Sequence, residues 1–179
     1  MCLKKRIHSA WLAFGANLGD RFENIAGGIA YLSTHGVELV DCSSIYETKP
    51  VGYLDQPDFY NMVALVTTTL EPFDLLGVCQ EAEQVFLRER SFLWGPRTLD
   101  IDILIFDDLT MDSPALTLPH PRMGERSFVL GPLEEIGGDV IKKWGYTPTR
   151  DGIELAIPAR ALKARVACLA ASMDSGADV

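Results

Sequence analysis

Two aspartates, Asp100 and Asp102, interrupt a stretch that otherwise has the composition of a buried strand. The stretch reads WGPRTLDIDILIFD over residues 94–107. Residues two apart in a strand point to the same side, so we expect both carboxylates on one face, with Leu104 and Phe106 further along it. The three alternating isoleucines then point into the core. The polar pair therefore needs a chemical reason for its place in an apolar strand.

Paired carboxylates in this spacing can hold a divalent cation. The strand rise puts their Cα atoms roughly 7 Å apart, and two carboxylates held this close repel each other unless a proton or cation lies between them. Oxygen ligands in small number suit Mg²⁺, which shares its coordination shell with water and substrate phosphates. An isolated DxD pair is more often a solvated strand face. Asp100 and Asp102 are thus candidate magnesium ligands. The residues around them must distinguish a metal site from a solvated strand face.

Arginines immediately before the aspartates favour a phosphate ligand. Arg88, Arg90 and Arg97 stand against a single acidic residue, Glu89, between residues 85 and 99. A metal that bridges phosphate oxygens, together with guanidinium groups that neutralise developing charge, is what a polyphosphate requires. No Walker A motif is present, and the turn GANLGD lacks its lysine and spacing. Phosphate binding is therefore expected to rest on side chains and metal.

Composition bounds the class of protein. The 179 residues predict one domain with a substantial apolar core, and the net charge of −9 argues against nucleic-acid binding. The four cysteines form no CxxC pair, which argues against a structural zinc site and is typical of free thiols in a reducing cytoplasm. No apolar stretch approaches the ~20 residues of a membrane span. We therefore expect a cytoplasmic protein without nucleic-acid or membrane partners. A monomer is also expected, although composition does not determine the oligomeric state.

Hydrophobic periodicity and turn residues indicate a mixed α and β chain. Asp20 and Glu23 have the spacing of a capping box, and Pro72 stands where prolines open helices. The order βαββαβ predicts an α+β sandwich whose antiparallel sheet carries helices on one face, the other being open to ligands or covered by loops. Strands are predicted over 7–14, 37–46, 59–70 and 99–107, and helices over 21–34, from 72, near 130–137 and over about 158–173.

Four ordered motifs then resemble one enzyme family. They are FGANLGD, YETKPVGYLDQPDFYN, WGPRTLDIDILIFD and LPHPRMGERSFVLGPL, within residues 7–136. Together they resemble 6-hydroxymethyl-7,8-dihydropterin pyrophosphokinases of folate biosynthesis. The resemblance implies a ferredoxin-like fold and transfer of pyrophosphate from ATP to the pterin's hydroxymethyl oxygen, with release of AMP. It implies a pyrophosphokinase domain over 1–145 and leaves 146–179 as a C-terminal extension that packs on it or contacts another subunit.

The resemblance also implies roles for individual residues. Asp100 and Asp102 match the ligands of two Mg²⁺ ions, and Arg88 and Arg97 match arginines that steady the transferred group. A flat pterin needs aromatic faces and an amide at its rim, which Phe59, Phe128 and Asn61 can supply. The ATP-binding set is Gln80, Glu83, Arg90, Trp94, Ile103, His120 and Arg126. The pterin-binding set is Thr48, Val51, Gly52, Phe59, Asn61, Trp94 and Phe128.

The chain departs from the family pattern at three motif positions. Ala16 stands where the family usually has serine, and Phe59 where it usually has tyrosine. Leu87 stands where a glycine usually precedes the first loop arginine, in a loop about one residue shorter than usual. Two other functions stay open at this point. One is a magnesium-dependent phosphoryl or nucleotidyl transferase with another acceptor, and the other is a non-catalytic ferredoxin-like module that binds nucleotide or pterin.

Overall fold

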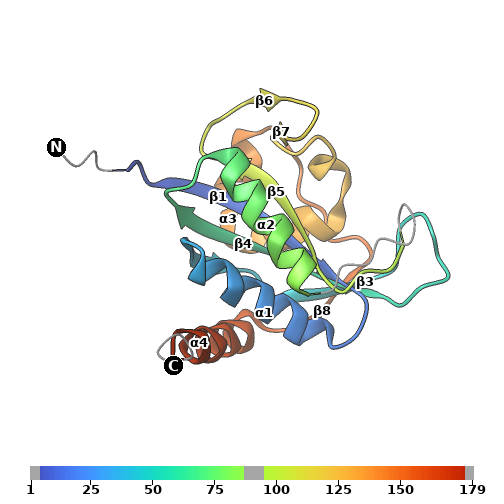
Figure 1. Cartoon of the computed structure of the whole chain (residues 1–179). Helices are drawn as coiled ribbons and strands as arrows, with labels where there is room; N and C mark the ends of the chain where they lie inside the picture. The colour runs from blue at the N-terminus through green and yellow to red at the C-terminus, as the bar shows by residue number, and fades with distance from the viewer. Residues whose placement is uncertain (1–4, 87–94, 176–179) are drawn as a thin grey trace.

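A six-stranded antiparallel sheet forms the centre of the molecule (Figure 1). This computed structural model describes residues 5–86 and 95–175. The strand order is β5-β1-β4-β3-β8, with β2 also paired to β4, and β6 and β7 form a separate two-stranded sheet. The elements are β1 (His8–Ala16), α1 (Arg21–Thr34), β2 (Val37–Cys42), β3 (Ile45–Thr48), β4 (Phe59–Thr68), α2 (Pro72–Val85), β5 (Asp100–Phe106), β6 (Met111–Asp112), β7 (Thr117–Leu118), a 3-10 turn (Met123–Glu125), α3 (Ser127–Lys143), β8 (Ile153–Ile157) and α4 (Ala159–Ser175).

Helices cover both faces of the sheet. One core lies between the sheet and α1, α2 and α4, and includes Ile25, Leu75 and Leu162. A second core lies between the sheet and α3, and includes Val129 and Leu133. Figure 1 shows α1 and α2 in front of the sheet and α3 behind it. The expectation of a second face that is open or covered only by loops is therefore wrong. The helix predicted near 130–137 is longer than expected and packs there.

The N-terminus of α1 has half of the expected capping arrangement. The Asp20 carboxylate accepts the backbone N–H of Glu23 at 3.1 Å, as an N-cap residue does. The Glu23 carboxylate serves another contact, because it accepts hydrogen bonds from Arg165 of α4, the shortest at 2.7 Å. The capping residue was predictable from local spacing, whereas the partner of Glu23 lies 142 residues away.

The single strand predicted over residues 37–46 is two strands, β2 and β3. The break falls at two serines whose side chains replace regular sheet bonding. The backbone N–H of Val63 donates to the Ser43 hydroxyl at 3.0 Å, and both the N–H and the hydroxyl of Ser44 donate to the carboxylate of Glu135 on α3. Because serine and a distant carboxylate satisfy these backbone groups, the chain continues along β4 from β2 into β3 across an interruption in the regular pairing.

Strict alternation along β5 holds only for its first half. Asp100 and Asp102 lie on one face, while Ile101 and Ile103 pack in the core beneath α1 and α2. The register shifts between Trp11 and Leu12 of the partner strand β1. Beyond this irregularity Ile105 joins the α3 core and Phe106 the opposite one, so the expected facing of these two residues is wrong.

Residues after 145 add a strand and a helix to this framework. Strand β8 pairs with β3, and α4 packs against α1 with Leu162 and Val166 buried. Lys163 donates to the Asp41 carboxylate at 2.6 Å, a hydrogen bond that holds the pKa of Asp41 below its usual value. No helix in the described ranges has both the length and the apolar character needed to span a membrane.

Candidate active site

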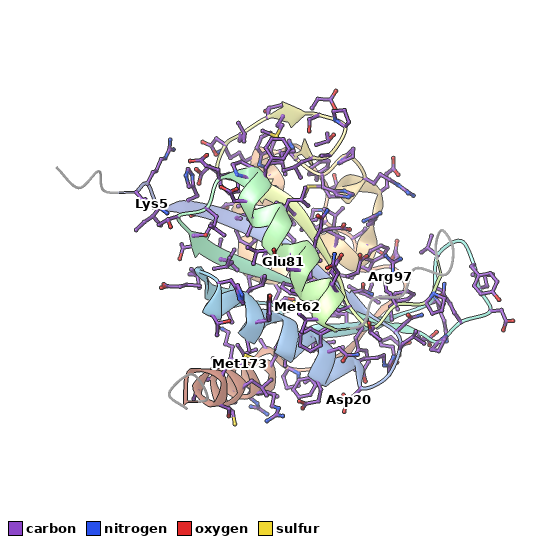
Figure 2. All side chains as sticks on the ribbon, in the orientation of Figure 1. Lys5, Asp20, Met62, Glu81, Arg97 and Met173 are labelled. Atoms are coloured by element: carbon purple, nitrogen blue, oxygen red, sulfur yellow. The ribbon has the colours of Figure 1, made fainter. Side chains whose placement is uncertain are left out.

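A large cavity, with a volume of about 550 Å³, lies where β1 ends and β5 begins. The sheet register explains its floor, because Gly15 of β1 lies opposite both Asn61 of β4 and Asp100 of β5. A row of carboxylate, glycine and amide therefore crosses three adjacent strands. Figure 2 shows Arg97 at this end of the sheet, far from Lys5 at the other.

Each of the two candidate metal ligands is paired with an arginine, and the two arginines come from different segments of the chain. Arg97, three residues before β5, donates from Nη1 to Asp100 Oδ2. Arg126, just before α3, donates from Nη1 to Asp102 Oδ2 at 3.1 Å. All four side chains line the large cavity. The site thus presents two negative and two positive groups side by side, a set that can take a metal and an anionic ligand together.

The two arginines also approach the two predicted stacking rings. The guanidinium carbon of Arg97 lies 5.5 Å from the centre of the Phe59 ring, and that of Arg126 lies 5.6 Å from the centre of the Phe128 ring. These distances are in the range of cation–π contacts. The aromatic part of the cavity and its charged part are therefore contiguous, and each arginine lies at their boundary.

Asn61 is oriented by a buried hydrogen bond. Its Nδ2 donates to Thr48 Oγ1 at 2.7 Å, and both side chains are buried and line the cavity. Val51 also lines the cavity from the loop after β3. Gly52 follows it with a φ of 89°, in the region that favours glycine, and turns this loop. Of the predicted pterin residues that the structure describes, Gly52 does not line this cavity, whereas the others do: Thr48, Val51, Phe59, Asn61 and Phe128.

His120 faces Asp102 with a defined tautomer. The backbone N–H of Arg122 donates to His120 Nδ1 at 3.2 Å, so a neutral ring carries its proton on Nε2. Nε2 lies 3.9 Å from Asp102 Oδ2. Burial lowers the pKa of His120, which the Asp102 carboxylate partly opposes. His120 therefore presents a neutral N–H donor to the charged end of the cavity.

A second, smaller cavity of about 240 Å³ adjoins the first. Asp102 and His120 line both cavities, so the carboxylate stands at their junction. Leu76 of α2 and Ile103 of β5 supply apolar walls to the smaller one. Its position allows a group attached to a ligand to enter it while the charged part of that ligand reaches Asp102.

Several predicted residues lie elsewhere. In the described part of the chain, Gln80 is exposed on α2 and Glu83 is buried, and neither lines the two cavities. The carboxylate Oε1 of Glu83 accepts the backbone N–H of Ile101 at 2.8 Å and so supports the start of β5. Arg88, Arg90 and Trp94 lie outside the described residues, and their roles stay predictions.

Several cavity residues were not among the predicted site residues, and four of them lie in two of the recognised motifs. Lys49, Gln56, Arg122 and Val129 line the large cavity. All four fall inside motifs that were recognised as segments, so the signal was present in YETKPVGYLDQPDFYN and LPHPRMGERSFVLGPL. The fold determines which side chains of a motif face inward, and motif membership alone does not.

Comparisons with known proteins indicate one family. Residues 11–138 match the family model for 7,8-dihydro-6-hydroxymethylpterin-pyrophosphokinase (HPPK). The Bacillus subtilis 2-amino-4-hydroxy-6-hydroxymethyldihydropteridine pyrophosphokinase is 47% identical over 135 residues, which are 75% of this chain and 81% of that protein. The Folic acid synthesis protein fol1 of Schizosaccharomyces pombe is 38% identical over 146 residues, which are 81% of this chain but only 20% of that protein.

Solved structures show the same fold. A crystal structure of Plasmodium falciparum HPPK-DHPS matches with a TM-score of 0.63 at 15% identity, and covers 90% of this chain and 44% of that one. The predicted ferredoxin-like α+β fold is thereby confirmed. With the matched family model spanning most of its length, the chain belongs to the 7,8-dihydro-6-hydroxymethylpterin-pyrophosphokinase family.

Proposed function

We propose that this chain transfers the pyrophosphoryl group of ATP to the hydroxymethyl oxygen of 6-hydroxymethyl-7,8-dihydropterin, and so makes the pterin diphosphate and AMP for folate biosynthesis. One observation carries the proposal. The paired aspartates and their arginines line one cavity together with two aromatic rings, and Asp102 is shared with a second cavity whose wall includes Leu76 and Ile103. A reaction that joins a flat ring to a nucleotide's phosphates needs this order of environments.

The aspartate pair fits Mg²⁺. Asp100 and Asp102 are hard oxygen ligands on one face of a strand and border the cavity. In the described ranges no third acidic, histidine or cysteine side chain completes a closed metal cluster with them. Mg²⁺ prefers a coordination shell in which one or two carboxylates bind the ion and phosphates and water occupy the remaining positions. When bound, two such ions would neutralise the triphosphate and polarise the β-phosphorus.

Arg97 is suited to the transferred group. Its Nε is buried, and among the described residues it has no hydrogen-bond partner, while its Nη1 pairs with Asp100. A buried donor without a partner costs free energy unless a ligand satisfies it. A phosphate oxygen supplies that acceptor and keeps the planar guanidinium beside Asp100. Arg97 thereby stabilises the charge that develops on the pyrophosphoryl group.

The nucleotide occupies the charged junction and the smaller cavity. Ile103 and Leu76 contact the adenine ring, and His120 and Arg126 donate to the phosphates. Because His120 holds its proton on Nε2, it donates without adding a charge. Arg126 exchanges part of its contact with Asp102 for phosphate oxygens, which keeps the cation and the carboxylate in one network.

The pterin occupies the aromatic part of the large cavity. Phe59 and Phe128 lie against its faces, and Asn61 reads its donor and acceptor rim with the orientation that Thr48 imposes. Val51 borders the ring from the loop after β3, and Gly52 turns that loop. The hydroxymethyl oxygen then points to the phosphates, attacks the β-phosphorus and releases its proton. The bond from that phosphorus to the α–β bridging oxygen breaks, and AMP leaves with the oxygen.

Product analysis tests this proposal against the alternatives. The purified chain is incubated with ATP, Mg²⁺ and 6-hydroxymethyl-7,8-dihydropterin, and products are identified by phosphorus NMR and mass spectrometry. AMP and a pterin diphosphate in equal amounts support the proposal. ADP with a pterin monophosphate, or pyrophosphate with an adenylylated pterin, would assign a phosphoryl or nucleotidyl transferase. Ligand binding without consumption of ATP would assign a non-catalytic module.

A further inference from the structure

The side chain of Asn17 joins two segments that are distant in sequence and line the same cavity. Its Nδ2 donates to Gln56 Oε1 and to the carbonyl oxygen of Pro57, both at 3.0 Å. Its Oδ1 accepts the backbone N–H of Arg97 at 2.8 Å. Gln56 and Arg97 both line the large cavity, whereas Asn17 is only 2% exposed and lies behind it.

The backbone at Asn17 strengthens one of these links. The N–H groups of Asn17 and Leu18 donate to the carbonyl oxygen of Arg97 at 3.0 and 3.2 Å. Both backbone polar groups of Arg97 are therefore held by the turn after β1. The side-chain amide of Asn17 is buried, so water cannot replace a hydrogen-bond partner that it loses. A shift that breaks one of its hydrogen bonds therefore leaves a buried polar atom unpaired.

Each linked segment carries a group that the proposed reaction uses. Pro57 lies two residues before Phe59, whose ring faces the Arg97 guanidinium. Arg97 in turn pairs with Asp100. The loop over residues 49–58 is thus joined through one buried amide to the arginine at the phosphate end.

We propose that Asn17 is a positioning residue that couples the two substrate sites, so that a bound pterin strengthens the binding of the nucleotide's phosphates and the reverse. The inference rests on the proposed function, because it concerns the same two ligands. Asn17 touches neither ligand and acts through Gln56, Pro57 and Arg97. The coupling is reciprocal, as any linkage between two binding equilibria must be.

A purely structural role for Asn17 is the competing explanation. Asn24 offers a matched comparison, because its Nδ2 donates to the carbonyl of Leu18 at 3.0 Å within the same turn. Asn24→Ala loosens that turn without removing a bond to the loop or to Arg97. Asn17→Asp keeps the acceptor for the Arg97 N–H, but places carboxylate oxygen against the carbonyl of Pro57 and the Gln56 side chain.

Calorimetry measures the coupling directly. The Kd of α,β-methylene-ATP is determined with Mg²⁺, first without and then with saturating 6-hydroxymethyl-7,8-dihydropterin, which cannot react because the methylene bridge is not cleaved. The ratio of the two Kd values removes effects on nucleotide binding alone, since these enter both measurements equally. We expect a ratio of at least about fivefold in the unaltered chain and in Asn24→Ala, and a ratio close to one in Asn17→Asp.

A ratio in Asn17→Asp equal to that of the unaltered chain would overturn the inference, as would an equal loss in Asn24→Ala or a ratio near one in the unaltered chain. If Asn17→Asp fails to fold, Gln56→Leu replaces it, because this partly exposed residue holds the loop side of the same link. An unaltered chain that binds no pterin in the presence of nucleotide would instead refute the proposed function.

Discussion

Gly15 of β1 lies directly opposite Asn61 of β4, and a Cβ atom on Gly15 would stand 3.2 Å from Asn61 Oδ1 and 4.0 Å from the Cβ of Asp100. The glycine therefore leaves open the space between the amide proposed to read the pterin and the carboxylate proposed to hold metal. A Cβ there would force the Asn61 amide to shift by a few tenths of an ångström, whereas it would meet Asp100 at an ordinary contact distance. The turn motif GANLGD thus contributes a floor to the site as well as a connection.

Gly15→Ala is expected to weaken pterin binding at least about tenfold, because the methyl group displaces the Asn61 amide by a few tenths of an ångström and narrows the cavity. Pterin affinity is measured by calorimetry with nucleotide analogue and Mg²⁺ present. Gly77→Ala in α2 is the control, since nothing lies within 4 Å of its Cβ position. Unchanged affinity in Gly15→Ala would mean that Asn61 does not contact the pterin.

Thr48→Val is expected to lower pterin affinity while leaving nucleotide affinity unchanged. Valine keeps the shape of threonine but removes the acceptor of the Asn61 N–H, so a buried donor loses its partner, at a cost of roughly 1–3 kcal/mol. Thr48→Ser keeps the hydroxyl and should retain most of the affinity. A fall of the same size in Thr48→Ser would indicate that the loop backbone, rather than the hydroxyl, matters.

Arg97→Ala is expected to reduce kcat on the order of 100-fold or more while weakening ATP binding much less, because its guanidinium stabilises charge that develops in the transition state. Arg97→Lys keeps the charge but loses the planar donor pair, so it should recover only part of the rate. Steady-state kinetics and nucleotide titration give both quantities. Equal losses in kcat and in ATP affinity would place Arg97 in ground-state binding.

Leu162→Ala is expected to lower the free energy of unfolding by roughly 2–5 kcal/mol, since the side chain is fully buried between α4 and α1. Chemical denaturation measures the loss. Leu155→Ala on β8 is the matched control, because Leu155 is 63% exposed and should cost little. Equal stability of the two variants would mean that α4 contributes nothing to the folded domain.

Local sequence signals predicted the parts of the fold that depend on neighbouring residues. The period of two in β5 placed Asp100 and Asp102 on one face, and the spacing of Asp20 before an apolar helix located the start of α1. Pro72 likewise stands at the first turn of α2. Each of these features is decided within a few residues, so one sequence is enough to find it.

Features that depend on distant partners were not predictable. The break between β2 and β3 at Ser43 follows from a hydrogen bond with Val63. The Glu23 carboxylate accepts hydrogen bonds from Arg165 of α4 instead of capping its own helix. The irregularity opposite Trp11 reverses the facing of β5 only because of its pairing with β1. The hydrogen bonds of Asn17 were not predictable for the same reason, since its partners lie 39, 40 and 80 residues away.

The most direct test concerns Asp102, which borders both cavities and pairs with Arg126. In Asp102→Ala, release of AMP from ATP in the presence of the pterin and Mg²⁺ is measured under conditions where the unaltered chain turns over. A loss on the order of 100-fold or more, with folding retained by circular dichroism, is expected if this carboxylate holds the ion that polarises the phosphates. Turnover close to that of the unaltered chain would contradict the magnesium role of the pair.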